Sequence, residues 1–188
     1  PFATLGDTVA TLMGPITSST TLDASTTYLL SSQVFVQSPA TLTIPPGTTI
    51  HALPVAAGAP APAIVVEKGA SINAAGTAAS PITMTTVLAE SALSSSAQAQ
   101  TDTASSSGTI TLGERGKWGG LILLGNAPTS AATPKEIEGI SGKTYGGTNP
   151  SDGSGTLQYV RVWHGGAVIG ADNEINGITF AGVGSGTT

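Results

Sequence analysis

The chain of 188 residues contains no cysteine, which excludes disulfide bonds and thiolate chemistry but does not identify a compartment. Charged residues are only 9% of the sequence and aromatic residues only 4%, so a core must be built from aliphatic side chains rather than from large rings. Six basic against eleven acidic residues give a net charge of −5, which argues against nucleic acid binding, because that requires clustered Lys and Arg. No apolar run approaches the roughly 18 residues expected of a membrane span.

Other recognisable signals are missing as well. The first residue is Pro1 rather than methionine, so we expect a processed chain or a fragment, and we favour removal of a signal peptide and hence secretion. No Gly-x-Ser-x-Gly nucleophile elbow is present. No Asn-x-Ser/Thr acceptor occurs, since Asn149 is followed by proline. Any glycan is therefore expected on hydroxyl groups, within residues 94–107.

The residues that are abundant favour a β-structure with many corners. Hydrophobic residues reach 39%, together with 25 glycines and 12 prolines. A disordered chain combines low hydrophobicity with high charge, so this chain is expected to fold. Strong helix formers are scarce, whereas Thr and Ser are frequent, which favours strands joined by turns.

Short apolar strands recur between glycine corners. The clearest lies within residues 116–129 (GKWGGLILLGNAPT), where four apolar residues in succession indicate a fully buried strand. Residues 42–50 (LTIPPGTTI) and 64–72 (IVVEKGASI) align without gaps, so that Gly47 meets Gly69. A unit of strand, corner and strand that recurs about every 22 residues predicts a β-solenoid with roughly six to eight turns.

The predicted organisation is one solenoid with additions. Residues 1–25 are expected to form an N-terminal lead-in or cap, and residues 26–188 the solenoid. Two insertions are predicted, at about 89–107, rich in Ala, Ser and Thr, and at about 127–155. A disordered linker between two domains is the alternative for the first. Because a solenoid exposes strand edges at its ends, we expect the chain either to continue beyond Thr188 or to pair with another copy, end to end.

One strand near the C-terminus combines aromatic and basic side chains. Period-two alternation through Leu157, Tyr159, Arg161 and Trp163 predicts one strand with these four residues on the same face. The two aromatic residues could form a platform for stacking on a sugar. Packing in the core or at a corner is the alternative for the tryptophan.

Several of the quoted segments together carry a family resemblance. They are TLTIPPGTTI, IVVEKGASINAAGTAASPITM, GKWGGLILLGNAPT and the stretch from YGGTNPSDGSG to AGVGSGTT. They resemble secreted bacterial right-handed parallel β-helix proteins, found at the cell surface or exported and with relatives in marine microbes and algae. The likeness runs from about Ser18 to Thr188. It implies an all-β, right-handed parallel β-helix and export, and it implies no established catalytic activity.

An acidic group of residues is the candidate metal site. Asp152, Asp172, Asn173 and Glu174 could offer oxygen ligands to Ca²⁺ from two loops that follow adjacent turns of the coil. Turn sequences whose side chains cap their own backbone are the alternative. No other cofactor is expected.

An enzymatic role is the alternative because the β-helix is also a scaffold of polysaccharide lyases and hydrolases. Such sites need paired carboxylates, or Ca²⁺ with a base. The grouping offered is Asp152, Arg161 and Glu174. Glu136 and Glu138 would also share a strand face, and a solvated edge explains them equally well. Neither His51 nor His164 has a carboxylate or serine at a recognisable spacing in the sequence, and both are interpreted as structural.

Thr-x-Thr triplets raise a third possibility, an ice-binding face. They occur at residues 41–43, 83–85 and 109–111. Because these triplets are not spaced by one constant turn, no regular ladder is expected. We predict an extracellular structural or adhesive surface protein that is not an enzyme and that self-associates through its ends. Such end-to-end assembly would build a filament or surface layer. A polysaccharide-binding or polysaccharide-degrading protein is the alternative.

Overall fold

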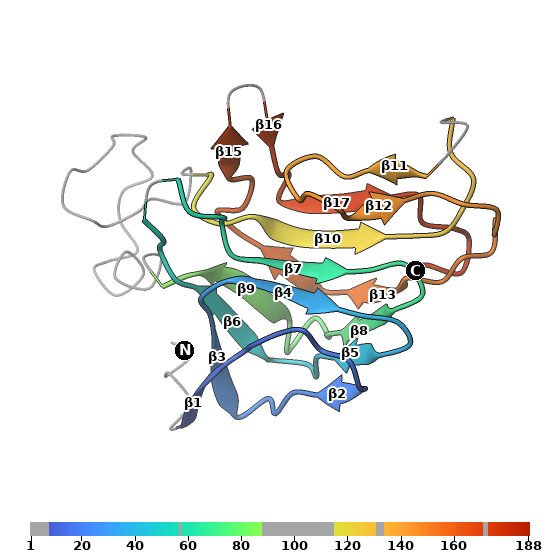
Figure 1. Ribbon diagram of the computed structural model, residues 1–188. Coiled ribbons are helices and arrows are strands. Elements are labelled where there is room, and N and C mark those ends of the chain that lie inside the picture. Colours follow the sequence, from blue (N-terminus) through green and yellow to red (C-terminus); the bar gives the residue numbers. More distant parts are fainter. Residues whose placement is uncertain (1–7, 57, 88–114, 131–133, 171–172) are drawn as a thin grey trace.

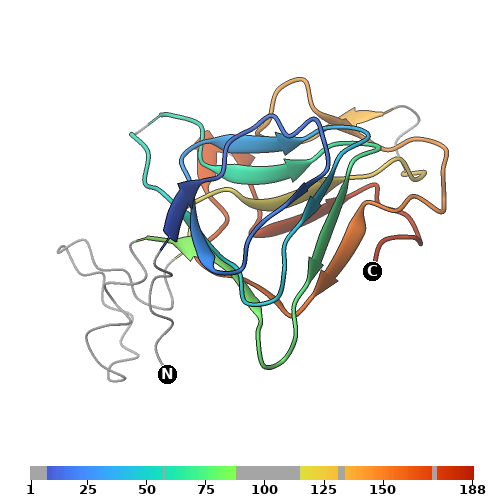
Figure 2. The same ribbon diagram turned by 90° about the horizontal axis from the view of Figure 1, so that it is seen from below.

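The computed structural model describes residues 8–56, 58–87, 115–130, 134–170 and 173–188; for 168–170 and 173–174 it describes the backbone alone. Within these ranges the chain forms a right-handed parallel β-helix, as predicted, whose strands stack into three walls around an apolar interior (Figure 1). Figure 2, turned by 90°, shows how the walls enclose that interior. None of the described residues forms a helix with the length and apolar character that crossing a membrane requires.

Each wall is a parallel sheet whose strands come from successive turns of the chain. Wall A contains β1 (Thr8–Thr11), β3 (Thr26–Leu30), β6 (Thr49–Ala52), β9 (Ile82–Thr86) and β14 (Val160–Val162). Wall B contains β4 (Gln33–Val36), β7 (Ala63–Val66), β10 (Gly120–Leu124) and β17 (Ile178–Ala181), and Ile16 extends it through a bridge to Val36. Wall C contains β2 (Thr20–Thr21), β5 (Thr41–Thr43), β8 (Ser71–Ala75) and β13 (Gly155–Gln158).

The chain visits the walls in the order A, B, C, and five such levels are stacked. Thr27 pairs with Thr49, as the predicted spacing of about 22 residues requires. The next levels are longer, because Thr49 pairs with Thr83 and Thr41 pairs with Ser71. The repeat is therefore not constant, and the described part of the coil has five levels rather than six to eight.

The predicted alignment of residues 42–50 with 64–72 is wrong, because the two segments lie on different pairs of walls. Ile72 pairs with Leu42 rather than with Ile50, which instead pairs with Met84. Gly47 lies at the corner between walls C and A, whereas Gly69 lies between walls B and C. Each level contains three similar units of strand and corner, so the sequence pattern alone does not say which unit matches which.

The interior is aliphatic, as the composition predicts. Alternate residues of each strand point inward and stack level upon level, and the central ones are 0–1% exposed. Burying each such side chain contributes about 1.5–3 kcal/mol. Examples are Val34, Ile64 and Leu121 on wall B, Leu42 and Ile72 on wall C, and Ile50 and Met84 on wall A.

Wall B is covered on its outer face as well. A hairpin of β11 (Lys135–Glu136) and β12 (Thr144–Tyr145) lies over it, and Ile137, Ile140 and Tyr145 pack on the outward side chains of β7 and β10. All five residues of β10 are consequently buried. This confirms the fully buried strand predicted from its apolar run. A second hairpin, β15 (Val168–Gly170) and β16 (Asn173–Glu174), stands at the edge of the coil in Figure 1.

The predicted single strand from Leu157 to Trp163 is divided by a corner. Tyr159 has a φ of 48°, in the left-handed region, and separates β13 on wall C from β14 on wall A. Leu157 packs against the interior, whereas Arg161 is exposed on the outside. The prediction that these two residues share one face is therefore wrong, because the left-handed residue turns the chain between two walls.

Candidate functional site

The outer face of wall A carries a column of polar side chains that crosses four levels. The pairing register places Thr27, Thr49, Thr83 and Arg161 beside one another. Thr27 is buried, Thr49 and Thr83 are half-buried and Arg161 is exposed, so the column opens toward the fifth level. Because adjacent strands lie about 4.8 Å apart, a linear ligand along the coil axis would meet one of these side chains per level.

An Arg–Trp pair forms the open end of this column. The guanidinium carbon of Arg161 lies 5.9 Å from the centre of the Trp163 ring, within the range of a cation–π interaction. Tyr159 stands at the adjoining corner with 61% of its surface exposed. The side chains of one short segment thus present a cation and two aromatic rings at the surface.

Trp163 is fixed in place by the segment that precedes β10. The indole Nε1 of the buried Trp118 donates a hydrogen bond of 2.8 Å to the backbone carbonyl of Trp163. The backbone N–H of Lys117 donates to the carbonyl of His164, also at 2.8 Å. This pairing places the exposed Arg115 and the half-buried Lys117 next to the corner at His164, which follows the strand that carries Arg161. Arg115, Lys117 and Arg161 are half of the chain's six basic residues, and they lie on β14 or next to the corner that follows it.

A buried polar cluster that no sequence pattern predicts lies beside Trp163. His51 is the register partner of Thr85, and the hydroxyl of Thr85 lies 2.9 Å from Nδ1 of His164. All three side chains are less than 9% exposed. The backbone of His164 has a φ of 61°, so a corner in a left-handed conformation turns its ring onto wall A. These contacts agree with a structural role for the two histidines.

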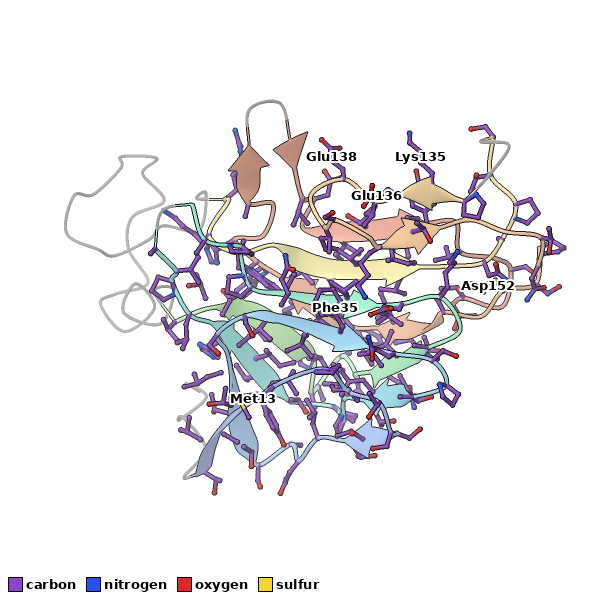
Figure 3. The ribbon with its side chains drawn as sticks, in the orientation of Figure 1. Met13, Phe35, Lys135, Glu136, Glu138 and Asp152 are labelled. Carbon is purple, nitrogen blue, oxygen red and sulfur yellow. The ribbon has the colours of Figure 1, made fainter. Side chains whose placement is uncertain are left out.

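As far as the structure describes them, the residues proposed for calcium lie in two separate parts of the coil. Asp152 is 7% exposed at the corner before β13, where its Oδ2 accepts a hydrogen bond of 2.8 Å from Ser154. Asn173 and Glu174 form β16, which lies at the opposite edge of the coil from Asp152 in Figure 3. Asp172 is outside the described residues. The described side chains include no group of three or more His, Asp or Glu placed to hold a metal, and calcium binding stays a prediction.

The structure also separates Asp152 from Arg161, two of the residues proposed for catalysis. Arg161 lies on wall A, whereas Asp152 is buried at the corner between walls B and C. Figure 3 shows Glu136 and Glu138 on the outer hairpin over wall B. Both are exposed, and the carboxylate of Glu136 accepts a hydrogen bond from the backbone of Gly142 within that hairpin. These carboxylates do not line the face that carries Arg161.

The model of a family described as a pectate-lyase-like β-helix domain matches residues 14–97 and 103–188, which is most of the chain. No curated protein and no solved structure matches the sequence significantly. The family match agrees with the three-walled parallel coil.

Proposed function

Because the chain belongs to the family of pectate-lyase-like β-helix domains, we propose that it binds an acidic polysaccharide outside the cell, on the outer face of wall A. The observation that carries the proposal is the exposed Arg161 beside Trp163, at the open end of a column of threonines. The binding residues are Arg161, Trp163 and Tyr159, with Thr83 and Thr49 along the column.

The chemistry of these side chains suits a chain of uronate sugars. A guanidinium group binds a carboxylate through two parallel hydrogen bonds. An indole or phenol ring offers a flat apolar surface for the C–H face of a sugar ring. The net charge of −5 repels a polyanion at a distance. Arg161 on wall A, with Arg115 and Lys117 next to the corner that follows it, would provide the local attraction.

An adhesive role outside the cell follows from such binding, and it unites the two functions that the sequence suggests. End-to-end assembly stays a separate prediction. On the fifth level Ile178 and Phe180 occupy the register positions of the inward-facing Leu121 and Leu123, and they are 38% and 53% exposed.

The proposal is tested by affinity electrophoresis in gels that contain polygalacturonate or alginate, with a neutral dextran gel as reference. We expect retardation in the two acidic gels alone. Replacing Arg161 by Ala is expected to weaken binding about tenfold, the usual loss for a hydrogen bond to a charged group. Replacing Trp163 by Ala is expected to weaken it in both acidic gels as well.

Lys135→Ala is the matched control, since it removes an exposed positive charge from the hairpin over wall B. It should bind like the unchanged protein. Equal weakening by Lys135→Ala and Arg161→Ala would mean that total charge, rather than wall A, controls binding, and the proposal would fail. The same samples are assayed for new reducing ends and for the absorbance of unsaturated products, because cleavage would make the protein an enzyme rather than a binding protein.

A further inference from the structure

The outer face of wall C is an array of uncharged side chains, most of which are short and polar. Its outward residues come from β2, β5, β8 and β13, from Ser19, which precedes β2, and from the final residue. They are Ser19, Thr21, Thr41, Thr43, Ser71, Asn73, Ala75, Thr156, Gln158 and Thr188. All ten are exposed or half-buried, and none is charged or aromatic.

The longest column of this array crosses all five levels. Thr21 pairs with Thr43, Thr43 with Asn73 and Asn73 with Thr156. The hydroxyl of Thr156 lies 2.9 Å from that of Thr188, which continues the column to the fifth level. Four of the five members are threonines, which present a hydroxyl and a methyl group side by side.

A second column runs parallel to the first, two residues earlier on each strand. Thr41 pairs with Ser71, and the hydroxyl of Ser19 accepts a hydrogen bond of 3.1 Å from the backbone of Thr41. Members of one column lie about 4.8 Å apart, and the two columns lie roughly 6.6–7 Å apart along the strands. The hydroxyls therefore form a two-dimensional grid on a parallel sheet.

We propose that the outer face of wall C binds ice. Both grid spacings are close to repeats of the ice lattice, so the hydroxyls can hold water molecules at lattice positions. The threonine methyl groups limit the binding of water molecules at other positions. A charged side chain would order water around itself instead, and this face has none. Because wall C also lacks the cation and the rings of wall A, a polysaccharide is the less suitable occupant.

The structure explains why the sequence does not predict this ladder. The triplet at residues 83–85 belongs to wall A and that at 109–111 is outside the described residues, so only 41–43 contributes. The other positions are held by different small polar residues. The register is kept even though the chain between successive strands of wall C varies in length, because the extra residues leave the coil at the corners.

The test is the behaviour of single ice crystals in a nanolitre osmometer. We expect the full chain to shape the crystal and to produce thermal hysteresis, with both effects lost in Thr43→Lys. Thr43→Val, which removes the hydroxyl and keeps the shape, should lower the hysteresis. Circular dichroism shows whether Thr43→Lys is folded. If it is not, the hysteresis of Thr43→Val tests the proposal instead.

Thr11→Lys is the matched control, because Thr11 is an exposed threonine on β1 of wall A. It should keep full activity, and so should Arg161→Ala, which separates this proposal from polysaccharide binding. The proposal is overturned if the unchanged chain neither shapes ice nor shows hysteresis, or if Thr11→Lys loses as much as Thr43→Lys. It is also overturned if Thr43→Lys abolishes binding to polygalacturonate, or if it dissociates a dimer as measured by analytical ultracentrifugation. Wall C would then bind a polysaccharide or a second copy of the chain.

Discussion

At Gly120 the chain enters β10 with a φ of 94° and with the backbone of the next level against its Cα. A Cβ atom built there would collide with the carbonyl groups of Gly177 and Asn176. Two features therefore require glycine at this position: the positive φ and the close approach of two levels of the coil. Its neighbour Gly119 and the buried Trp118 complete this corner.

Replacing Gly120 by Ala should destabilise the coil more than replacing Gly142 by Ala. Gly142 also has a positive φ, of 75°, but nothing lies within 4 Å of the position of its Cβ. The second substitution should cost about 1–2 kcal/mol of unfolding free energy, for the left-handed conformation alone. The first should cost more, since the level above must shift. Urea unfolding of both variants measures the difference, and equal losses would contradict the close packing of the levels.

Among the elements, the hairpin of β11 and β12 is joined to wall B by one polar network. Nζ of Lys143 lies 2.8 Å from Oε1 of Glu67, which also accepts a hydrogen bond of 3.1 Å from Gln37. The same ammonium group lies 4.7 Å from the centre of the Phe35 ring. Figure 3 shows Phe35 over wall B. This network and the apolar contacts of Ile137 and Ile140 hold the hairpin on the sheet.

A double-mutant cycle with Glu67→Gln and Lys143→Met should give a coupling free energy of about 0.5–1 kcal/mol. The value is modest because the two side chains are 25% and 22% exposed, and a partly solvated ion pair is screened. Chemical unfolding of the four proteins measures it. In the control cycle, Lys135→Met replaces Lys143→Met, and its coupling with Glu67→Gln should be near zero. A similar coupling in both cycles would contradict a specific contact.

For the whole molecule, the sequence predicts the architecture better than it predicts the site. The apolar run of β10 and the glycine corners are local features, and they suffice to predict a coil with an aliphatic interior. Which strands pair between successive levels of the coil, by contrast, does not depend on local sequence. Ile72 lies beside Leu42 because of the number of residues in the corners that connect their strands. The sequence of residues 64–72 contains no information about that number.

The same limit applies to the functional residues. Arg161 and Trp163 are two positions apart on one strand, so their proximity could be predicted. Thr85 is the register partner of His51 and contacts His164, an arrangement that depends on pairing between distant strands. Asp152 and Glu174 are both near the C-terminus, yet the corner at Asp152 and strand β16 lie at opposite edges of the coil.

The central claim, that wall A binds an acidic polysaccharide, is tested most directly by hydroxyl-radical footprinting with and without saturating polygalacturonate. Tyr159 and Trp163 should be oxidised more slowly in the bound protein, because the sugar chain covers their rings. Met13, which is 71% exposed at the other end of the coil, serves as the internal reference and should be oxidised at the same rate in both samples. Unchanged oxidation of Tyr159 and Trp163, or equal protection of Met13, would contradict the claim.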